Sequence, residues 1–436
     1  MTETYIANLG IENLNDMQLK TLQAIVPGCS VTLIAPTGSG KTLAFLLPAF
    51  KLLRNKAAGV QILIIVPSRE LAIQVGDVIK EMKTGYKVNI CYGGHDFKTE
   101  VNNFREPASV IIGTPGRLAD HIRRKSFDTA SVHTLIIDEF DKSLELGFST
   151  EIKQIIDSLS GLKTKVLTSA TDSEQFGSYF PGSNFLKLLF EPGLISEALK
   201  LKAVRAAGND KLDLLFRLLC SFAGETALVF CNHREAVERI SKLLSYNGLP
   251  HGIYHGGMEQ YNRELSLIRF RNGSHQILLT TDLASRGLDI PGIMHVVHYQ
   301  LPAAEASWVH RNGRTARMFA EGTSWLVLAE NESIPYFIKT IPETAELTEE
   351  SFLPPFPEWE TIYISAGKKQ KISRGDIAGF LLKNTHLQTS DIGKIDITDH
   401  ASFVAIKRAE CVSVLKKIKG LPLKKKALQI ELAYQL

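Results

Sequence analysis

Two motifs, well separated in the chain, contain residue types that act on a nucleoside triphosphate. Residues 35–42 read Ala-Pro-Thr-Gly-Ser-Gly-Lys-Thr, and the apolar run at 134–137 is followed at once by Asp138 and Glu139. The first motif fits the phosphate-binding loop G-x-x-x-x-G-K-[ST], except that Ala35 replaces its first glycine. Two carboxylates after a buried strand can serve a metal ion and a water. Together the motifs predict nucleoside triphosphate hydrolysis with Mg²⁺.

The loop and the carboxylates have distinct expected roles. Loop glycines let backbone N–H groups turn toward phosphate oxygens, and the helix that begins near Lys41 adds the positive end of its dipole. We expect Lys41 to contact the β and γ phosphates. Thr42 would ligate Mg²⁺, Asp138 would hold the ion through water, and Glu139 would orient and deprotonate the attacking water. The expected nucleotide-binding residues of the loop are Pro36, Thr37, Gly38, Ser39, Gly40, Lys41 and Thr42.

Length and charge indicate several domains with different partners. A chain of 436 residues is too long for one compact core. The formal net charge is +4, yet residues 361–436 contain 14 Lys and Arg against 6 Asp and Glu. This segment holds the whole positive excess, which predicts a nucleic-acid-binding module appended to an enzyme. A merely well-solvated, lysine-rich surface stays open on charge alone.

The cysteines and the N-terminus argue against several other classes. The five cysteines show no C-x-x-C spacing, so neither a zinc site nor a disulfide framework is expected. The N-terminus has no basic start and no apolar run, and no stretch reaches the length of a membrane span. We expect a cytoplasmic monomer with no membrane partner.

Apolar runs rich in β-branched residues alternate with helical patterns in two successive series. Continuous hydrophobicity predicts strands buried on both faces, as in parallel α/β sheets. A proline-bearing acidic stretch then precedes a strand, helix, strand, strand, helix, strand pattern, the order of a split βαβ sandwich. The expected strands are 30–34, 61–66, 88–92, 109–112, 134–137, 165–168, 227–230, 251–254, 275–279 and 295–298. The expected domains are 1–195, 196–340 and 361–436, with a linker at 341–360.

Seven short motifs in fixed order resemble those of the DEAD-box RNA helicase family. They are A-P-T-G-S-G-K-T, P-S-R-E-L-A, T-P-G-R, D-E-F-D, S-A-T, T-D-L-A-S-R-G-L-D and H-R-N-G-R-T-A-R, and they lie between residues 35 and 317. The resemblance implies two RecA-like parallel-sheet domains, ATP and Mg²⁺ as cofactors, and RNA as the partner. Phe140 replaces the family's usual Ala, Ser68 its Thr, and Asn312 and Ala316 its common Ile and Gly. None of these changes removes a charged catalytic group.

The resemblance also implies roles at particular positions. Gln18 corresponds to the adenine-reading glutamine, whose amide can donate and accept at once; a glutamine that only caps a helix stays open, and the usual upstream aromatic falls on Met1. Arg314 and Arg317 correspond to arginine fingers at the γ-phosphate. Asp289 joins the nucleotide side. Ser169, Thr171 and His310 are expected to couple hydrolysis to RNA handling.

RNA contacts are implied in the same way. Small residues and backbone N–H groups suit phosphate and ribose contacts, which position a strand without reading its sequence. Simple surface charges remain the alternative for the arginines. The implied residues are Pro67, Arg69, Gly93, Gly94, Thr114, Pro115, Gly116 and Arg117 in the first domain, and Arg263, Thr280 and Thr281 in the second.

Residues 361–436 resemble the C-terminal RNA-binding domain of the DbpA/YxiN subgroup, notably at 367–379 and 391–395. Such domains are RRM-like, and the resemblance implies a target in large-subunit ribosomal RNA during ribosome assembly. Tyr363 and Phe403 fall on base-stacking positions, where Ala401 replaces a third aromatic; packing inside the sandwich is the equal alternative. The residues expected at phosphates are Lys368, Lys369, Lys371, Arg374, Lys394, Lys407 and Arg408.

Three rival functions remain. A P-loop kinase or motor ATPase would share residues 35–42 and 138–141 but would not explain Gln18 or the paired arginines. An RNA-binding scaffold that has lost hydrolysis is opposed by the intact Lys41 and Glu139. A general RNA remodeller without a ribosomal target would share every motif of the core.

Overall fold

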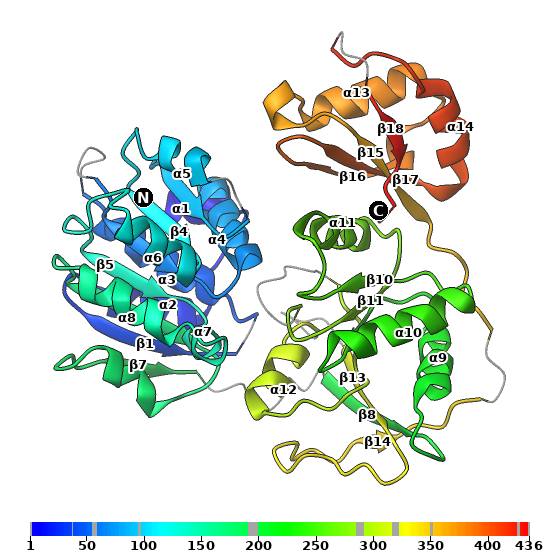
Figure 1. Cartoon of the computed structure of the whole chain (residues 1–436), viewed down its shortest axis with the longest axis horizontal. Coiled ribbons are helices and arrows are strands. Elements are labelled where there is room, and N and C mark those ends of the chain that lie inside the picture. Colours follow the sequence, from blue (N-terminus) through cyan, green and yellow to red (C-terminus); the bar gives the residue numbers. More distant parts are fainter. Residues whose placement is uncertain are drawn as a thin grey trace. The chain divides into compact units, whose positions relative to one another are not determined.

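The computed structural model describes residues 2–36, 38–54, 59–94, 97–190, 199–284, 292–315, 322–348, 352–424 and 428–434 (Figure 1). The chain separates into two compact units. The first unit contains residues 1–198 and takes in 306–319; the second contains most of the remainder, including the C-terminal domain. Within the described residues, every helix falls short of the length and apolarity that a membrane crossing requires.

The first unit is built on a parallel sheet with helices on both faces (Figure 1). Its strand order is β3-β4-β2-β5-β6-β1-β7, and all its neighbouring strands are parallel. The strands are β1 (Ser30–Ile34), β2 (Ile62–Ile65), β3 (Val88–Cys91), β4 (Val110–Gly113), β5 (Thr134–Ile137), β6 (Thr164–Ser169) and β7 (Leu186–Leu189). The helices are α1 (Thr2–Asn8), α2 (Asp16–Ala24), α3 (Lys41–Leu52), α4 (Arg69–Glu81), α5 (Phe97–Asn103), α6 (Pro115–Arg123), α7 (Phe140–Glu145), α8 (Ser149–Ser158) and the 3₁₀ turn η1 (Glu174–Tyr179).

The central strands of this sheet are apolar on both faces for a physical reason. Successive side chains of a strand point to opposite faces, and in β2 Ile62 and Ile64 join one hydrophobic cluster while Leu63 and Ile65 join the other. Helices cover both clusters, so a strand that lies between them is apolar at most of its positions. The expected continuous hydrophobicity therefore indicates the layered fold correctly.

The second unit repeats the plan with a sheet of order β10-β11-β9-β12-β13-β8-β14. Neighbouring strands are again parallel. The strands are β8 (Leu199–Arg205), β9 (Ala227–Phe230), β10 (Gly252–Tyr254), β11 (Ile277–Thr280), β12 (His295–His298), β13 (Gly322–Leu328) and β14 (Glu343–Thr344). The helices of this unit are α9 (Leu212–Ser221), α10 (Arg234–Tyr246) and α11 (Gln260–Arg271); α12 (Glu305–Asn312) follows β12, but its residues from 306 onward cluster with the first unit. The expected class of two parallel-sheet α/β domains is confirmed.

The C-terminal domain is a four-stranded antiparallel sheet of order β16-β17-β15-β18 with two helices on one face. In chain order it contains β15 (Trp359–Ile364), α13 (Arg374–Asn384), β16 (Ile392–Ile397), β17 (Ser402–Lys407), α14 (Arg408–Ile418) and β18 (Ile430–Leu432), with short 3₁₀ turns at Lys368–Gln370 and Thr389–Asp391. The strand and helix order is the one that the sequence predicts. Both ends of the expected 341–360 linker are structured, because β14 pairs with β8 and β15 begins at Trp359.

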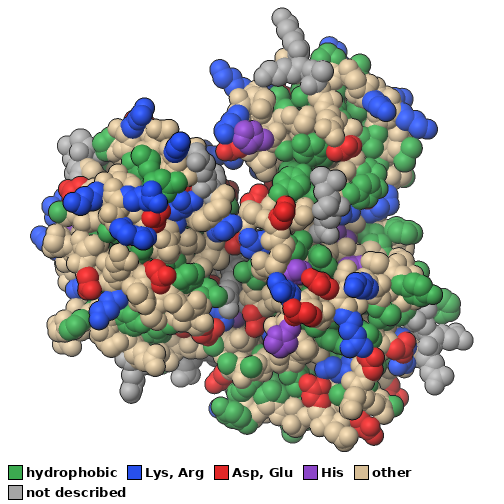
Figure 2. Space-filling view, viewed as in Figure 1, with side chains coloured by type: hydrophobic (Ala, Val, Ile, Leu, Met, Phe, Trp, Pro, Cys, Tyr) green, Lys and Arg blue, Asp and Glu red, His purple; other side chains and the backbone are tan. Residues whose placement is uncertain are grey.

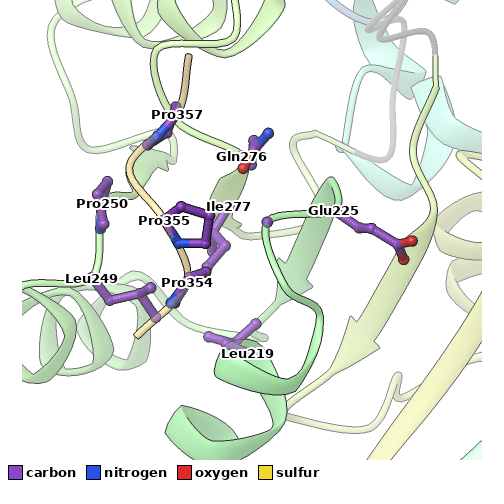
Figure 3. Close-up of a pocket in the computed structure, with 10 residues that line it drawn as sticks. Leu219, Glu225, Leu249, Pro250, Gln276, Ile277, Pro354, Pro355 and Pro357 are labelled. Atoms are coloured by element: carbon purple, nitrogen blue, oxygen red, sulfur yellow. The ribbon is translucent and has the colours of Figure 1, made fainter. Parts of the chain in front are cut away.

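The other face of this small sheet packs on α11 of the preceding domain. Phe403 and Ala401 are buried there against Leu265 and Ile268, with Tyr363 at the edge of the cluster. The stretch before β15 follows the same domain: Figure 3 shows the prolines at 354, 355 and 357 beside side chains of α9 and β11. The C-terminal domain is therefore fastened to the second RecA-like domain through its sheet and through its linker.

Arg408 is the main polar fastener of this junction. Its Nε donates to the carbonyl of Pro357 at 2.7 Å, and its Nη2 donates to the carbonyl of Ser274 at 3.0 Å. Its Nη1 lies 2.7 Å from Glu360, which is 5% exposed. The hydroxyls of Ser274 and Thr361 add a hydrogen bond of 2.7 Å. One guanidinium thus joins the linker, the second domain and the C-terminal sheet.

Candidate nucleotide and RNA sites

The phosphate loop follows β1 and ends at the first residue of α3. Gly40 has φ +89°, which a residue with a side chain rarely adopts, and it turns the chain into the helix. The Lys41 ammonium is buried and donates to the carbonyls of Ala35 at 2.5 Å and Pro36 at 3.1 Å. Burial lowers the pKa of Lys41, although the carboxylates of Asp138 and Glu139 oppose that shift. The lysine is therefore held inside the loop that is expected to receive phosphates.

Helix α2 is attached to this loop by its first turn. Asn15 and Gln18 form a capping box: Gln18 N donates to Asn15 Oδ1 at 2.9 Å, and Asn15 N donates to Gln18 Oε1 at 3.0 Å. The same side chains reach the loop, where Asn15 Nδ2 donates to the carbonyl of Ser39 at 3.1 Å and Gln18 Nε2 to that of Gly40 at 3.4 Å. Gln18 is both a helix cap and a neighbour of the loop. Its reading of adenine stays a prediction.

The two carboxylates after β5 lie in different surroundings, and both are buried. Asp138 accepts hydrogen bonds from the Thr168 hydroxyl and, at 3.1 Å, from the backbone N–H of Glu139. Burial, together with the charge of Glu139, raises the pKa of Asp138 to about 6. Glu139 has φ +47°, and its Oε2 is buried without a hydrogen-bond partner among the residues that the structure describes. An unpaired buried carboxylate oxygen is costly, so this atom is suited to a water that arrives with substrate.

Asp141 connects the carboxylate motif with Ser169-Ala170-Thr171. Its Oδ2 accepts from Ala170 N at 3.2 Å, from Thr171 N at 3.3 Å and from Thr171 Oγ1 at 3.1 Å. His310 Nε2, in a segment that clusters with the first unit, lies 3.7 Å from the same oxygen. Burial opposes ionisation of Asp141, but His310, Lys41 and Ser169 outweigh it and hold its pKa below the ordinary value. The structure thus brings the expected coupling residues together around Asp141.

Phe140, for which the sequence offers no physical reason, has an evident place in the fold. Its side chain is fully buried and packs against Phe176 at 4.9 Å between ring centroids and Tyr179 at 5.2 Å. Both partners belong to η1, which follows Ser169-Ala170-Thr171. The ring therefore links the carboxylate motif to the next motif by packing, beside the polar link at Asp141.

The RNA-facing residues expected in the first domain come together at one edge of the sheet. Pro67, Gly93 with Gly94, and Thr114 follow β2, β3 and β4, which are neighbours in the strand order. A Cβ on Gly94 would lie 2.5 Å from Arg69 Nη1, so this glycine permits close approach of the arginine. Pro115 begins α6, whose first turn contains Gly116 and Arg117. Figure 2 shows Lys and Arg side chains over the part of this domain that contains α6.

The expected RNA-facing residues of the second domain lie on two elements. Thr280 ends β11, where its buried hydroxyl donates to the carbonyl of Tyr254 at 2.8 Å, and Thr281 follows. Arg263 lies in the first turns of α11 and donates from Nη2 to Gln260 at 2.5 Å.

Arg314, the expected arginine finger, is buried, and its charge contributes to lowering the pKa of Lys41. Thr37, Asp289 and Arg317 lie outside the described residues.

The basic residues of the C-terminal domain fall into two groups. Lys368, Lys369, Lys371, Arg374 and Lys394 are exposed. The backbone N–H groups of Lys368 and Lys369 donate to the carbonyls of Thr398 and Asp399, which fixes their turn. Lys407 lies 3.6 Å from Asp391 and 3.8 Å from Glu358, and Arg408 is the fastener described above. The exposed group is available to a polyanion, whereas the second group is engaged by the protein.

Two aromatic residues of this domain, Tyr363 and Phe403, were expected either to stack on bases or to pack inside the sandwich, and the structure gives them a third environment. Phe403 lies outside the sandwich core and is covered by Leu265 and Ile268 of α11, and the partly buried Tyr363 packs against the same cluster. Phe403 is 2% exposed. Sequence reasoning missed this cover because no local pattern in the C-terminal segment shows which helix lies on its sheet.

Three family models match successive parts of the chain. Residues 15–176 match the DEAD/DEAH box helicase family, 210–319 the helicase conserved C-terminal domain, and 361–432 the DbpA RNA binding domain. The chain is 30% identical over 442 aligned residues to ATP-dependent RNA helicase DbpA of Escherichia coli, covering 98% of this chain and 96% of that protein. It is 34% identical to ATP-dependent RNA helicase CshA of Listeria monocytogenes, but that match spans 73% of this chain and 62% of CshA.

Solved structures agree with the fold of the core. S. cerevisiae Dbp5 bound to RNA and ADP BeF3 gives a TM-score of 0.68 at 26% identity, covering 76% of this chain and 87% of Dbp5. Mss116p bound to ssRNA and AMP-PNP gives 0.69 at 25%, covering 80% and 77%. The chain therefore belongs to the DEAD-box family of ATP-dependent RNA helicases, in the subgroup with a DbpA-type RNA-binding domain.

Proposed function

We propose that this protein is an RNA-dependent ATPase that locally unwinds or remodels structured RNA. The observation that carries this proposal is the pair of buried carboxylates, Asp138 and Glu139, whose charges act on the Lys41 ammonium of the phosphate loop. Asp141 then ties the pair to the loop at 169–171 and to His310. Because Asp141 contacts both segments, a change at Asp138 and Glu139 when nucleotide and water bind would be passed to the loop at 169–171 and to His310.

The donor set fits Mg²⁺. A hydroxyl at Thr42 and a carboxylate at Asp138 are the oxygen ligands that this ion prefers, and its usual retention of water suits an indirect contact with Asp138. When bound, Mg²⁺ would neutralise charge on the phosphate oxygens. Because the pKa of Asp138 is raised to about 6, binding of the cation is expected to weaken as the pH falls toward that value.

The chain's own residues have complementary roles in hydrolysis. Lys41 would leave the carbonyls of Ala35 and Pro36 for phosphate oxygens, which are stronger, charged acceptors. Glu139 would orient the attacking water and take its proton, since its Oε2 has no competing partner among the described residues. Arg314 would stabilise charge that develops on the transferred group. These assignments follow the family positions and agree with the burial of all three side chains.

RNA binding is proposed at two surfaces with different tasks. The loops after β2, β3 and β4 would contact the backbone of a single strand without reading sequence. The exposed group Lys368, Lys369, Lys371, Arg374 and Lys394 would bind a structured RNA and hold the core near it, which raises the local concentration of substrate. We propose large-subunit ribosomal RNA in the cytoplasm as that target, supported by the DbpA-type domain and by the full-length similarity to E. coli DbpA.

ATPase stimulation by large-subunit ribosomal RNA, measured against unrelated RNA of equal length, tests the targeting proposal. Deleting residues 361–436 is a poor variant, because it would expose Leu265 and Ile268 of α11. Replacing Lys368, Lys369 and Lys371 with Gln keeps the junction and should remove the preference while generic stimulation survives. The matched control replaces Lys416, Lys417 and Lys419 with Gln, an equal loss of charge on exposed positions of the same domain. A ribosomal preference that survives the first triple variant contradicts the proposal, and equal stimulation of the unmodified chain by both RNAs favours a general remodeller.

A further inference from the structure

A cluster of side chains beneath Arg117 is not explained by the nucleotide site. Arg117 and His121 lie on one face of α6, because residues four positions apart share a helix face, and Arg124, the C-cap residue, follows three positions later. Phe97 and Glu100 of α5 face these residues: the Phe97 ring lies 5.5 Å from the Arg117 guanidinium and 4.5 Å from that of Arg124. This face is therefore the surface on which α5 packs against α6.

Glu100 is the centre of the cluster. Its Oε2 lies 2.7 Å from His121 Nε2 and 3.4 Å from Arg117 Nε, and its Oε1 accepts from Tyr92 N at 3.3 Å. Arg117 Nε also donates to the carbonyl of Tyr92 at 3.1 Å. Glu100 is 2% exposed. A carboxylate buried to this degree is stabilised only by close donors and a cation, and these contacts provide both.

His121 holds the carboxylate of Glu100 through its Nε2 atom. Its ring is fully buried, stacks on Phe97 with 4.6 Å between centroids, and has Nδ1 3.0 Å from the Ser126 hydroxyl. With one ring nitrogen and one ring face engaged, the other nitrogen can point only toward Glu100. The imidazole thus fixes the direction in which the carboxylate faces Arg117.

A metal site is the competing interpretation, since ligand atoms of Cys91, Glu100 and His121 lie within 4.8 Å of one another. Burial, together with the charge of Glu100, raises the pKa of the Cys91 thiol well above its ordinary value, so the thiol is neutral. Thiolate is the form that binds metals. The positive charge beside Glu100 is already supplied by Arg117, which a divalent cation would have to displace. The cluster is suited to holding a guanidinium.

We propose that Glu100 is the residue that positions Arg117 for the phosphate backbone of RNA, with His121 holding the carboxylate in place. The inference rests on the proposed RNA contact of Arg117. An arginine held by two acceptors and an aromatic ring loses less conformational freedom on binding than a mobile one, which favours affinity. Because α5 follows Gly93 and Gly94, the same contact ties this glycine loop to the first turn of α6.

Glu100→Gln in the full chain tests the proposal through binding of a labelled single-stranded RNA. The variant should bind about tenfold more weakly, as expected when one partner of a buried charge pair is neutralised. The RNA concentration for half-maximal ATPase should rise similarly, while the rate at saturating RNA changes by less than about twofold. In an Arg117→Ala background, Glu100→Gln should have no further effect, because the two act as one unit. Glu106→Gln, with a side chain that is 85% exposed, is the matched control.

Each outcome decides between the possibilities. If Glu100→Gln binds RNA with wild-type affinity while Arg117→Ala binds weakly, the positioning role of Glu100 is overturned and the RNA contact of Arg117 stands. Wild-type affinity of Arg117→Ala overturns the proposed contact itself. If Glu100→Gln lowers the RNA affinity equally in the presence and in the absence of Arg117, the role of Glu100 is merely structural and the positioning role is overturned. If Glu100→Gln fails to fold, His121→Leu takes its place and should weaken RNA binding about threefold only when Arg117 is present.

Discussion

Replacing Phe140 with Ala restores the residue that the family usually has, yet we expect it to destabilise this protein. Phe140 is fully buried and contacts the rings of Phe176 and Tyr179. Phe-to-Ala changes in cores cost about 3–5 kcal/mol. The backbone around the ring is held by Asp138 and Asp141, which limits collapse, but Tyr179 is half-buried and can move inward. We therefore expect the free energy of unfolding to fall by about 3 kcal/mol, near the lower end of that range.

Thermal unfolding of the full chain measures this loss. For a domain of this size, about 3 kcal/mol lowers the melting temperature by about 6–12 °C. ATPase activity below that temperature should be retained, because no group that touches the nucleotide changes. Tyr246→Ala removes a ring that is 90% exposed and should shift the melting temperature by less than about 2 °C. A Phe140→Ala protein that melts together with the Tyr246→Ala control would refute the packing argument.

Two further predictions concern the carboxylates and the domain junction. The pKa of Asp138 is higher in the folded protein, about 6 against 3.8, so the folded state binds the proton more tightly and the free energy of unfolding falls as the pH rises from about 4 to 6. Asp138→Asn should therefore abolish ATPase activity yet raise the free energy of unfolding by about 3 kcal/mol at pH 7.5, with the gain vanishing near pH 4 in urea titrations; a pH-independent gain would contradict the reasoning. Arg408→Ala leaves the buried Glu360 with Arg269 at 3.7 Å and the backbone N–H of Thr361 at 3.0 Å, so we expect the free energy of unfolding to fall by about 3 kcal/mol and hydrogen exchange at residues 357–361 to become faster. Lys407→Ala, a half-exposed neighbour, should change exchange little, and equal effects of the two variants would count against the fastener role.

Residues whose type is dictated by chemistry were the ones that the sequence could locate. The glycines and lysine of the phosphate loop, and Asp138 with Glu139 after a buried strand, lie beside one another as expected. The central strands of the first sheet were equally visible because their side chains are mostly apolar on both faces, whereas β13 of the second sheet was not among the expected strands although it is buried along almost its whole length. By contrast, β7 is largely exposed and β8 alternates between buried and exposed positions, so neither strand has the continuous apolar run that would predict it.

Contacts between distant parts of the chain were not visible in any local pattern. Phe140 appeared unexplained because its partners lie in η1, beyond β6. Arg408 resembled a phosphate-binding residue, but its acceptors are carbonyls of the linker and of Ser274. Phe403 fitted two environments, and the structure supplies a third, the side of α11. Burial by a neighbouring domain depends on docking, which composition and periodicity do not encode.

The central claim, that Glu139 activates water in an ATPase that responds to RNA, is tested most directly by turnover and binding of Glu139→Gln. With saturating ATP and Mg²⁺, RNA should raise the turnover of the unmodified chain, and the variant should bind ATP and RNA with unchanged affinity while its turnover is lost. Turnover of the unmodified chain that does not increase when RNA is added, or a variant that hydrolyses ATP as fast as the unmodified chain, would contradict the claim.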